Sequence, residues 1–165
     1  MSDLSNNANE QQAQILRYLT PAKNDPSYLV LKAHLIAEEE LNRFLGSRAK
    51  REAAIYSARL SFAQLLALCR AFHPFAEENW WVWNALQKLN SLRNTLAHNL
   101  EPKDLQERII EFSVFVADSA KMTKSSELAG HYDELIADSV HPFILAVVAL
   151  LGYLSGALSV YRPKQ

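Results

Sequence analysis

The chain has 165 residues, 49% of them apolar and only 4 of them glycine, which favours one helical domain over a turn-rich β fold. A net charge of -1 argues against a global basic surface for duplex DNA, and a single cysteine, Cys69, excludes a disulfide framework. Cys69 lies in an apolar run and is predicted to be a buried thiol. Residues 1–10 are polar and contain no apolar segment of the signal-peptide type, so we expect a cytoplasmic protein.

Residues 1–20 are predicted to be a flexible arm or a short helix, and residues 21–165 a single helical domain. Asp25-Pro26-Ser27 favours a helix start, because aspartate caps helix N-termini and proline suits the first turn. Apolar residues recur at helical spacing as far as Leu45, and Gly46 is expected to close this helix. A basic stretch over residues 48–51 follows, as a linker or as the exposed start of the next helix.

Four further helices are expected along the rest of the chain. Their approximate bounds are Leu60 to Phe72, Glu78 to Asn99, Lys103 to Lys121 and His131 to Tyr161. The sequence therefore predicts an all-α, up-and-down bundle of about five to six helices.

The last expected helix has no charged side chain between Pro142 and Tyr161. About twenty such residues can span a bilayer, and Gly152 and Gly156 have the spacing of closely packed membrane helices. The other helices also need an apolar partner, so we expect a central core helix or a dimer-interface helix. A C-terminal membrane anchor is the alternative.

The segment RNTLAH, residues 93–98, carries the clearest chemical signal. An arginine offers a fixed cation and a forked set of donors for a phosphate. A histidine titrates near neutrality and can move protons. Together these groups supply most of what RNA cleavage without a metal ion requires. Arg93, Asn94 and His98 are therefore the candidate catalytic residues.

Helical geometry assigns directions to these side chains. Asn94 and His98 are one turn apart and can face one surface together, with Gln87 and Ser91 on the same side. Arg93 lies at the edge of the core face and points about 140° away from His98. The arginine and the histidine can therefore meet at one phosphate only at a groove margin, at a distorted helix end or across a symmetric dimer.

On the first helix of the predicted domain, Glu38 falls on the apolar arc, whereas Glu39 and Glu40 point away and are expected to be solvated. A buried carboxylate is costly unless it is paired. We therefore expect an ion pair between Glu38 and Arg93, which would suit a structural lock and an oriented catalytic arginine equally well. His34 lies on the same arc, and a buried histidine with satisfied nitrogens is expected there.

Trp80, Trp81 and Trp83 lie within one turn and must cover more than one side of a helix. They suit base stacking, and they also suit an oligomer contact, which is the plainer explanation. At least one of them is expected to be exposed or at an interface. No histidine pair, acid–histidine cluster or glycine-rich loop in the sequence predicts a metal or a nucleotide cofactor.

The layout of Arg93, Asn94 and His98 near the end of a later helix, with an acid inside an earlier one, resembles the HEPN superfamily (higher eukaryotes and prokaryotes nucleotide-binding domains) and its R-x4-6-H signature. The resemblance covers about residues 27–158 and implies an all-α, dimeric, metal-independent endoribonuclease. It implies that Arg93 holds the scissile phosphate and that His98 transfers protons. It further implies that Asn94 positions the phosphate or the histidine, and that Glu38 orients Arg93.

The same resemblance implies the partners of the protein. RNA is the expected substrate, a homodimer is the expected assembly, and no DNA partner is expected. If the protein is a toxin or a defence or stress ribonuclease, we expect a protein antitoxin or regulator that blocks or modifies the site near His98.

Helical regulators that resemble the mannitol operon repressor offer an alternative from another class. They also combine an arginine-leucine helix, similar to Arg59-Leu60 here, with a later helix that ends in an asparagine-histidine type motif. On that alternative Arg93 and Glu38 lock the bundle, and the protein acts by binding a protein partner. Catalysis requires Arg93 and His98 to be open to solvent, whereas protein binding requires neither to be open.

Overall fold

The computed structural model of the protein describes residues 19, 25–73, 80–99, 102–122 and 140–159. All regular structure in these residues is helical, which confirms the prediction of an all-α bundle. The helices are α2 (Pro26–Arg48), α3 (Glu52–Ser57), α4 (Phe62–Phe72), α5 (Trp81–His98), α6 (Leu105–Ser119) and α8 (Val140–Ser159). Nearly all of the predicted N-terminal arm, and the first part of the helix expected from His131, lie outside the described residues.

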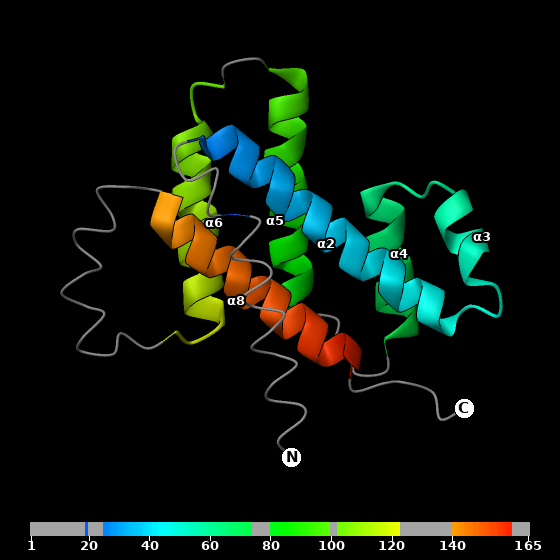
Figure 1. Cartoon of the computed structure of the whole chain (residues 1–165). Coiled ribbons are helices and arrows are strands. Elements are labelled where there is room, and N and C mark those ends of the chain that lie inside the picture. Colours follow the sequence, from blue (N-terminus) through cyan, green and yellow to red (C-terminus); the bar gives the residue numbers. More distant parts are fainter. Residues whose placement is uncertain (1–18, 20–24, 74–79, 100–101, 123–139, 160–165) are drawn as a thin grey trace.

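Helix α2 lies at the centre of the arrangement. It runs beside α8 in the same direction, and together these two helices cross the antiparallel pair of α5 and α6 (Figure 1). On its other side α2 contacts α4, which also packs on α5, and the short α3 packs on the C-terminal half of α2. Side chains around most of the circumference of α2 therefore meet another helix.

The start of α2 follows the prediction and its end does not. The Asp25 carboxylate accepts a hydrogen bond from the backbone N–H of Tyr28 at 3.1 Å, and a proline occupies the first turn. The helix then continues through Gly46 to Arg48. Gly46 is buried, and a Cβ atom at this position would lie 2.9 Å from Cγ of Glu52. This glycine therefore leaves room for the Glu52 side chain, and it does not end the helix.

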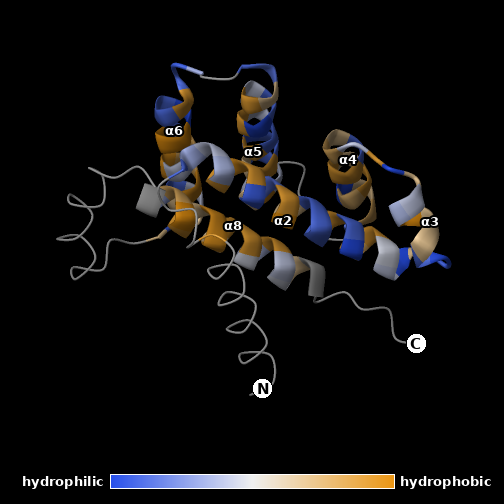
Figure 2. Ribbon diagram, turned by 45° about the horizontal axis from the view of Figure 1, so that its top comes forward, coloured by the Kyte–Doolittle hydropathy of each residue, from blue (hydrophilic) through white to orange (hydrophobic). Residues whose placement is uncertain are grey.

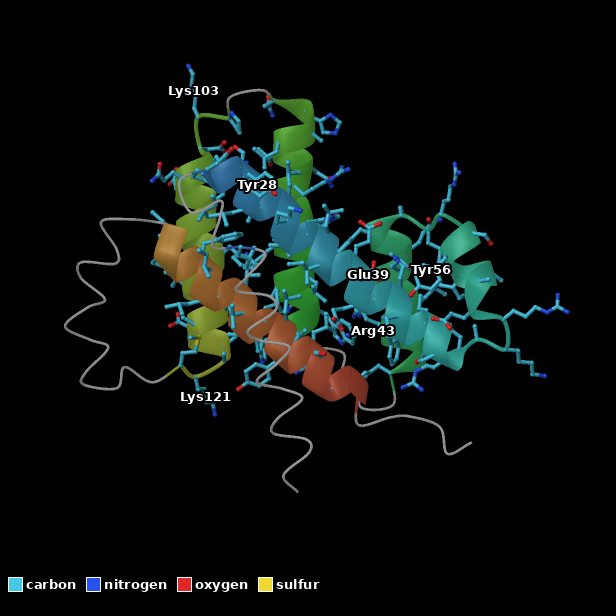
Figure 3. All side chains as sticks on the ribbon, in the orientation of Figure 1. Tyr28, Glu39, Arg43, Tyr56, Lys103 and Lys121 are labelled. Atoms are coloured by element: carbon cyan, nitrogen blue, oxygen red, sulfur yellow. The ribbon has the colours of Figure 1, made fainter. Side chains whose placement is uncertain are left out.

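Helix α3 occupies the region just after the basic stretch and has no buried residue. Figure 3 shows Tyr56 of α3 beside Glu39 and Arg43 of α2. Partial desolvation raises the pKa of Tyr56, the carboxylates of Glu39 and Glu52 raise it further, and Arg43 opposes them. The apolar side chain of Ile55 also packs against the core, so α3 meets the bundle through both apolar and polar groups.

Helix α4 begins with a capping box, in which Ser61 and Gln64 satisfy each other's backbone N–H groups. Its inner face places Cys69 against α2, and the thiol donates a hydrogen bond to the backbone oxygen of Leu41 at 3.5 Å. The cysteine is fully buried, which confirms the prediction for this residue. Burial raises the pKa of the Cys69 thiol to about 12, with Arg48 opposing the shift.

Helix α8 is a core helix, as the first of the two sequence interpretations expects. Its buried side chains are Phe143, Ile144, Ala146, Val147, Leu150, Leu151, Leu154 and Ser155. Figure 2 shows apolar colouring along most of α8, in contrast to the mixed colouring of α2 and α5. Each large apolar side chain that is fully buried in this way contributes roughly 1.5–3 kcal/mol. Within the part of the chain that the structure describes, no helix has the length and apolar character needed to cross a bilayer.

The three tryptophans differ in burial, and each contacts an aromatic ring of the same chain. Trp83 is 1% exposed, and Trp80 and Trp81 are half-buried. Trp81 makes an edge contact with the Tyr153 ring of α8, with ring centroids 5.1 Å apart. Rings from neighbouring segments thus contact the tryptophans, and because Trp80 and Trp81 keep part of their surface open to solvent, the expected oligomer contact stays a prediction.

Candidate functional site on helix α5

Helix α5 changes character along its length. Its buried residues are Val82, Trp83, Ala85, Leu86, Leu89 and Leu92, and no later residue described in this helix is buried. The helix ends at Asn99, whose backbone N–H and side-chain amide both donate to the backbone oxygen of Thr95, at 3.1 Å and 3.2 Å. The last turns therefore form a capped but uncovered helix end, and their polar side chains meet solvent.

A shallow hollow, open to solvent, lies along this part of α5. Its volume is about 420 Å³. Its lining residues are Gln87, Asn90, Ser91, Asn94, Thr95, His98 and Asn99, and we call this set the α5 polar face. Asn90, Asn94 and His98 follow one another at intervals of four residues, so each is turned only about 40° from the one before it. The predicted common face of Gln87, Ser91, Asn94 and His98 is confirmed.

Arg93 joins this face through Asn94. An Nη1 hydrogen of Arg93 donates to Oδ1 of Asn94 at 3.2 Å, and both side chains are exposed. A guanidinium group can only donate, so the amide oxygen of Asn94 must face Arg93 and the amide NH2 must face elsewhere. In the described part of the chain Arg93 makes no other hydrogen bond or ion pair, so its remaining N–H groups are available to an anion.

Asn90 is held from behind by His34 of α2. Nε2 of His34 lies 3.1 Å from Oδ1 of Asn90, and the imidazole ring packs on Phe62 with centroids 4.3 Å apart. His34 is only 5% exposed, which confirms the prediction of a buried histidine with a partner. An amide oxygen only accepts hydrogen bonds, so the Nε2 atom carries the proton. Nδ1 faces Oε2 of Glu38 at 3.7 Å, which is too long for a hydrogen bond.

The protonation of His34 follows from this environment. Burial lowers the pKa of His34, and Arg93 lowers it further, whereas the hydrogen bond to Asn90 and the carboxylate of Glu38 raise it. The net shift is downward from 6.5, so the ring is neutral at pH 7. A neutral ring with its proton on Nε2 is a fixed donor to Asn90.

The two acids of α2 differ from their predictions. The expected ion pair between Glu38 and Arg93 is not formed among the described residues, because Glu38 turns towards His34. Glu40, expected to be solvated, is 8% exposed and pairs with Arg43, while Ser155 of α8 donates to its Oε2 at 3.5 Å. The reason is the central position of α2, since α8 covers a side of this helix that the apolar pattern marks as outward.

A second cluster that the sequence did not reveal lies at the other end of α5. His73 is buried, stacks on Trp80 with centroids 5.5 Å apart, and meets the edge of Trp83 at 5.7 Å. The guanidinium carbon of Arg48 lies 4.1 Å from the centre of the Phe44 ring in the same region. Burial lowers the pKa of His73, the backbone of Ala157 opposes this, and Arg48 adds to it. His73 and Trp83 are buried in this cluster, whereas Trp80 keeps part of its surface open to solvent.

The arrangement on α5 thus brings Asn94 and His98 into one hollow, with Arg93 attached to Asn94, and leaves Glu38 apart from the arginine. In the described residues no group of three His, Cys, Asp or Glu side chains lies close enough together to hold a metal ion. Comparison of the chain with models of protein families, with curated proteins and with solved structures gave no match.

Proposed function

We propose that the protein is a metal-independent endoribonuclease of HEPN type whose reaction takes place on the α5 polar face, through Arg93, Asn94 and His98. One observation carries the proposal: Asn94 and His98 line the same open hollow, and Arg93 donates to Asn94 beside it. A permanent cation and an amide are therefore in contact, and an imidazole that can transfer protons lies on the same open surface as the amide. The resemblance of this segment to the HEPN signature supports the same assignment.

The reaction needs only these groups and the RNA. His98, as neutral imidazole, accepts the proton of a 2′-hydroxyl, and the 2′-oxygen forms a bond to the adjacent phosphorus. The bond from phosphorus to the 5′-oxygen breaks, and the imidazolium returns the proton to that oxygen. The products are a 2′,3′-cyclic phosphate and a 5′-hydroxyl. Arg93 donates to the non-bridging oxygens as their charge grows, and Asn94 holds the guanidinium in place.

The directions of the side chains favour a site made by two copies. Arg93 and His98 point about 140° apart on a regular helix, so one α5 cannot close both around one phosphate. A second copy, placed with its own α5 polar face opposite the first, would bring its arginine towards this His98. We therefore include a homodimer in the proposal, acting on RNA in the cytoplasm. A protein antitoxin or regulator that covers the hollow would silence it.

Two observations weigh against the alternative of a non-catalytic regulator resembling the mannitol operon repressor. Arg59-Leu60 does not belong to a helix, because it precedes α4 and Arg59 has a left-handed backbone conformation with φ of 48°. Arg93 and Glu38 do not lock the bundle, since they form no ion pair. Both Arg93 and His98 are open to solvent, as catalysis requires.

The experiment that tests the proposal is cleavage of a mixed cellular RNA pool in EDTA. It compares wild type with Arg93→Ala and His98→Ala, and uses Asn84→Ala as a matched control on the exposed side of the same helix, outside the hollow. We expect cleavage by wild type and by the control, and loss of cleavage in the other two variants with unchanged melting temperature and oligomeric state. Wild type that does not cleave, or activity that His98→Ala retains, would contradict the proposal and favour a protein-binding role.

A further inference from the structure

The α5 polar face extends further than the three candidate catalytic residues. We propose that Asn90 is an additional RNA contact on this face, and that the buried His34 is the positioning residue that holds it. This inference rests on the proposal that RNA is the ligand of the hollow. It adds a binding residue and its support to a site whose chemistry lies at His98.

Asn90 and Asn94 present the same chemical group to the hollow. The oxygen of Asn94 accepts from Arg93 at 3.2 Å, and the oxygen of Asn90 accepts from His34 at 3.1 Å. In each case the oxygen accepts from a donor that does not line the hollow, so each amide turns its NH2 group away from that donor, and both asparagines line the hollow. The face therefore carries two NH2 donors one helical turn apart, followed after another turn by the His98 imidazole.

Such a row of donors suits the sugar-phosphate backbone of one RNA strand. Positions four residues apart on a helix are separated by about 6 Å along its axis, which is comparable to the separation of neighbouring phosphates. Phosphate oxygens and 2′-hydroxyls are acceptors, and amide side chains are common donors to them. Asn90 lies about 12 Å along the axis from His98, which is about two phosphate spacings, so it can contact a nucleotide two positions along the strand but not the reacting phosphate.

Neutral donors would allow this face to hold RNA although no lysine or arginine lines the hollow. The net charge is -1, and the lining residues of the hollow include no lysine or arginine. Affinity from amide contacts does not depend on the release of counterions, unlike affinity from lysine and arginine contacts. Each contact then depends on correct orientation of the amide, because a freely rotating asparagine loses conformational entropy on binding.

His34 supplies that orientation. It is buried between α2, Phe62 of α4 and α5, it is neutral, and its Nε2 proton points at Asn90. His34 therefore cannot touch RNA itself and acts only through the asparagine. Glu38, at 3.7 Å from the other ring nitrogen, limits the orientations that the imidazole can take.

The test measures binding of a 2′-O-methyl RNA oligonucleotide, which cannot undergo attack by its 2′-oxygen, to the full-length protein. Asn90→Ala is expected to weaken binding roughly 3- to 10-fold, the range of one neutral hydrogen bond. Asn90→Asp keeps the acceptor for His34 but replaces the donor by a negative charge, so binding should weaken more. For both variants we expect KM for cleavable RNA to rise in proportion while kcat changes less than twofold, and Asn84→Ala to match wild type.

A double-mutant cycle tests the role of His34. His34→Leu fills the buried site without a donor and should weaken binding about as much as Asn90→Ala, whereas His34→Gln, which can still donate, should recover most of the affinity. In the Asn90→Ala background His34→Leu should have no further effect on binding by folded protein. Melting curves give the fraction of each variant that is folded. A merely structural role would instead weaken binding equally in both backgrounds.

The outcomes separate this inference from the proposed function. Wild-type cleavage combined with unchanged binding by Asn90→Ala overturns the inference alone. Equal effects of His34→Leu in both backgrounds overturn its positioning role. Oligonucleotide binding that depends on Asn90, without cleavage by wild type, overturns the proposed reaction and leaves the RNA contact standing. A wild type that neither binds nor cleaves RNA overturns both.

Discussion

The first turns of α5, around Trp83, and its last turns, around His98, differ in burial, in chemistry and in partners. The first turns lie in a group of aromatic rings that includes Phe44, His73 and Tyr153. They contain most of the buried side chains of the helix. The last turns contain no buried residue after Leu92 and carry donors and a titratable ring. One helix thus anchors itself at one end and presents polar groups at the other, so substitutions at the two ends should have separable consequences.

The largest effect is expected at the exposed end. His98→Ala should reduce RNA cleavage in EDTA by roughly 100- to 10,000-fold, because it removes the group that we propose transfers the proton. The melting temperature should stay the same, since His98 is exposed and buries no surface. Single-turnover cleavage rates and thermal melts of the same preparations measure the two quantities. A large fall in melting temperature would show that the last turns of α5 also stabilise the fold, and the two ends of the helix would then not differ in role.

The converse experiment is at the buried end. Trp83→Ala should lower the free energy of unfolding by about 3–5 kcal/mol, because it leaves a large cavity beside His73 and Trp80. Cleavage per folded molecule should not change, because Trp83 lies outside the hollow. Denaturant titration gives the stability, and activity is normalised to the folded fraction. Trp81→Ala, at a half-buried position, should cost less; an equal or greater loss would contradict the difference in burial.

A smaller effect concerns pH and the buried histidines. Burial lowers the pKa of His73 and of His34 in the folded protein, so the unfolded state binds more protons once the pH falls below about 6.5. The free energy of unfolding should therefore be constant above that value and should decrease as the pH falls to 5, by at most roughly 1.4 kcal/mol per pH unit for each histidine. His73→Phe, which keeps a ring against Trp80, should reduce this slope in denaturant titrations. An unchanged slope would show that His73 does not contribute.

The smallest expected effect concerns the two lysines at opposite ends of α6, of which only one lies near the exposed end of α5. Figure 3 shows Lys103 where α6 begins, at the end of the bundle at which α5 ends, and Lys121 at the opposite end of α6. Lys103→Gln should weaken RNA binding a few-fold and should reduce the salt slope of log affinity by about 0.7, the value for one phosphate contact. Lys121→Gln is the matched control and should leave the slope unchanged. Equal effects of the two substitutions would indicate non-specific binding over the whole surface.

The positions of most helices could be predicted because they depend on local pattern, although the short helix α3 was not expected as a separate element. The cap at Asp25, the apolar periodicity of each helix and the stop at Asn99 are all encoded within a few residues. The polar side of α5 could be predicted for the same reason, since directions on one helix follow from its geometry. Gly46 shows the limit of this reasoning, because its environment depends on Glu52 in the next helix.

The support behind the site could not be predicted, because it depends on contacts between distant segments. His34 and Asn90 are 56 residues apart in sequence, and neither residue type indicates the other. The signal that was available is weaker: Asn90 lies one turn before Asn94 on the same line, and a buried histidine requires a partner. The burial of Glu40 could not be predicted from the sequence for a related reason, since only the packed structure shows that α8 covers that side of α2.

The enclosed position of Cys69 has a consequence for the study of motion in this protein. With a pKa of about 12 and no exposure, the only thiol of the chain is both protonated and inaccessible at neutral pH. Thiol reagents react with thiolate that solvent can reach, so labelling must wait for α4 to separate from α2. The rate of labelling of the unaltered protein therefore reports how often that contact opens, without any introduced probe.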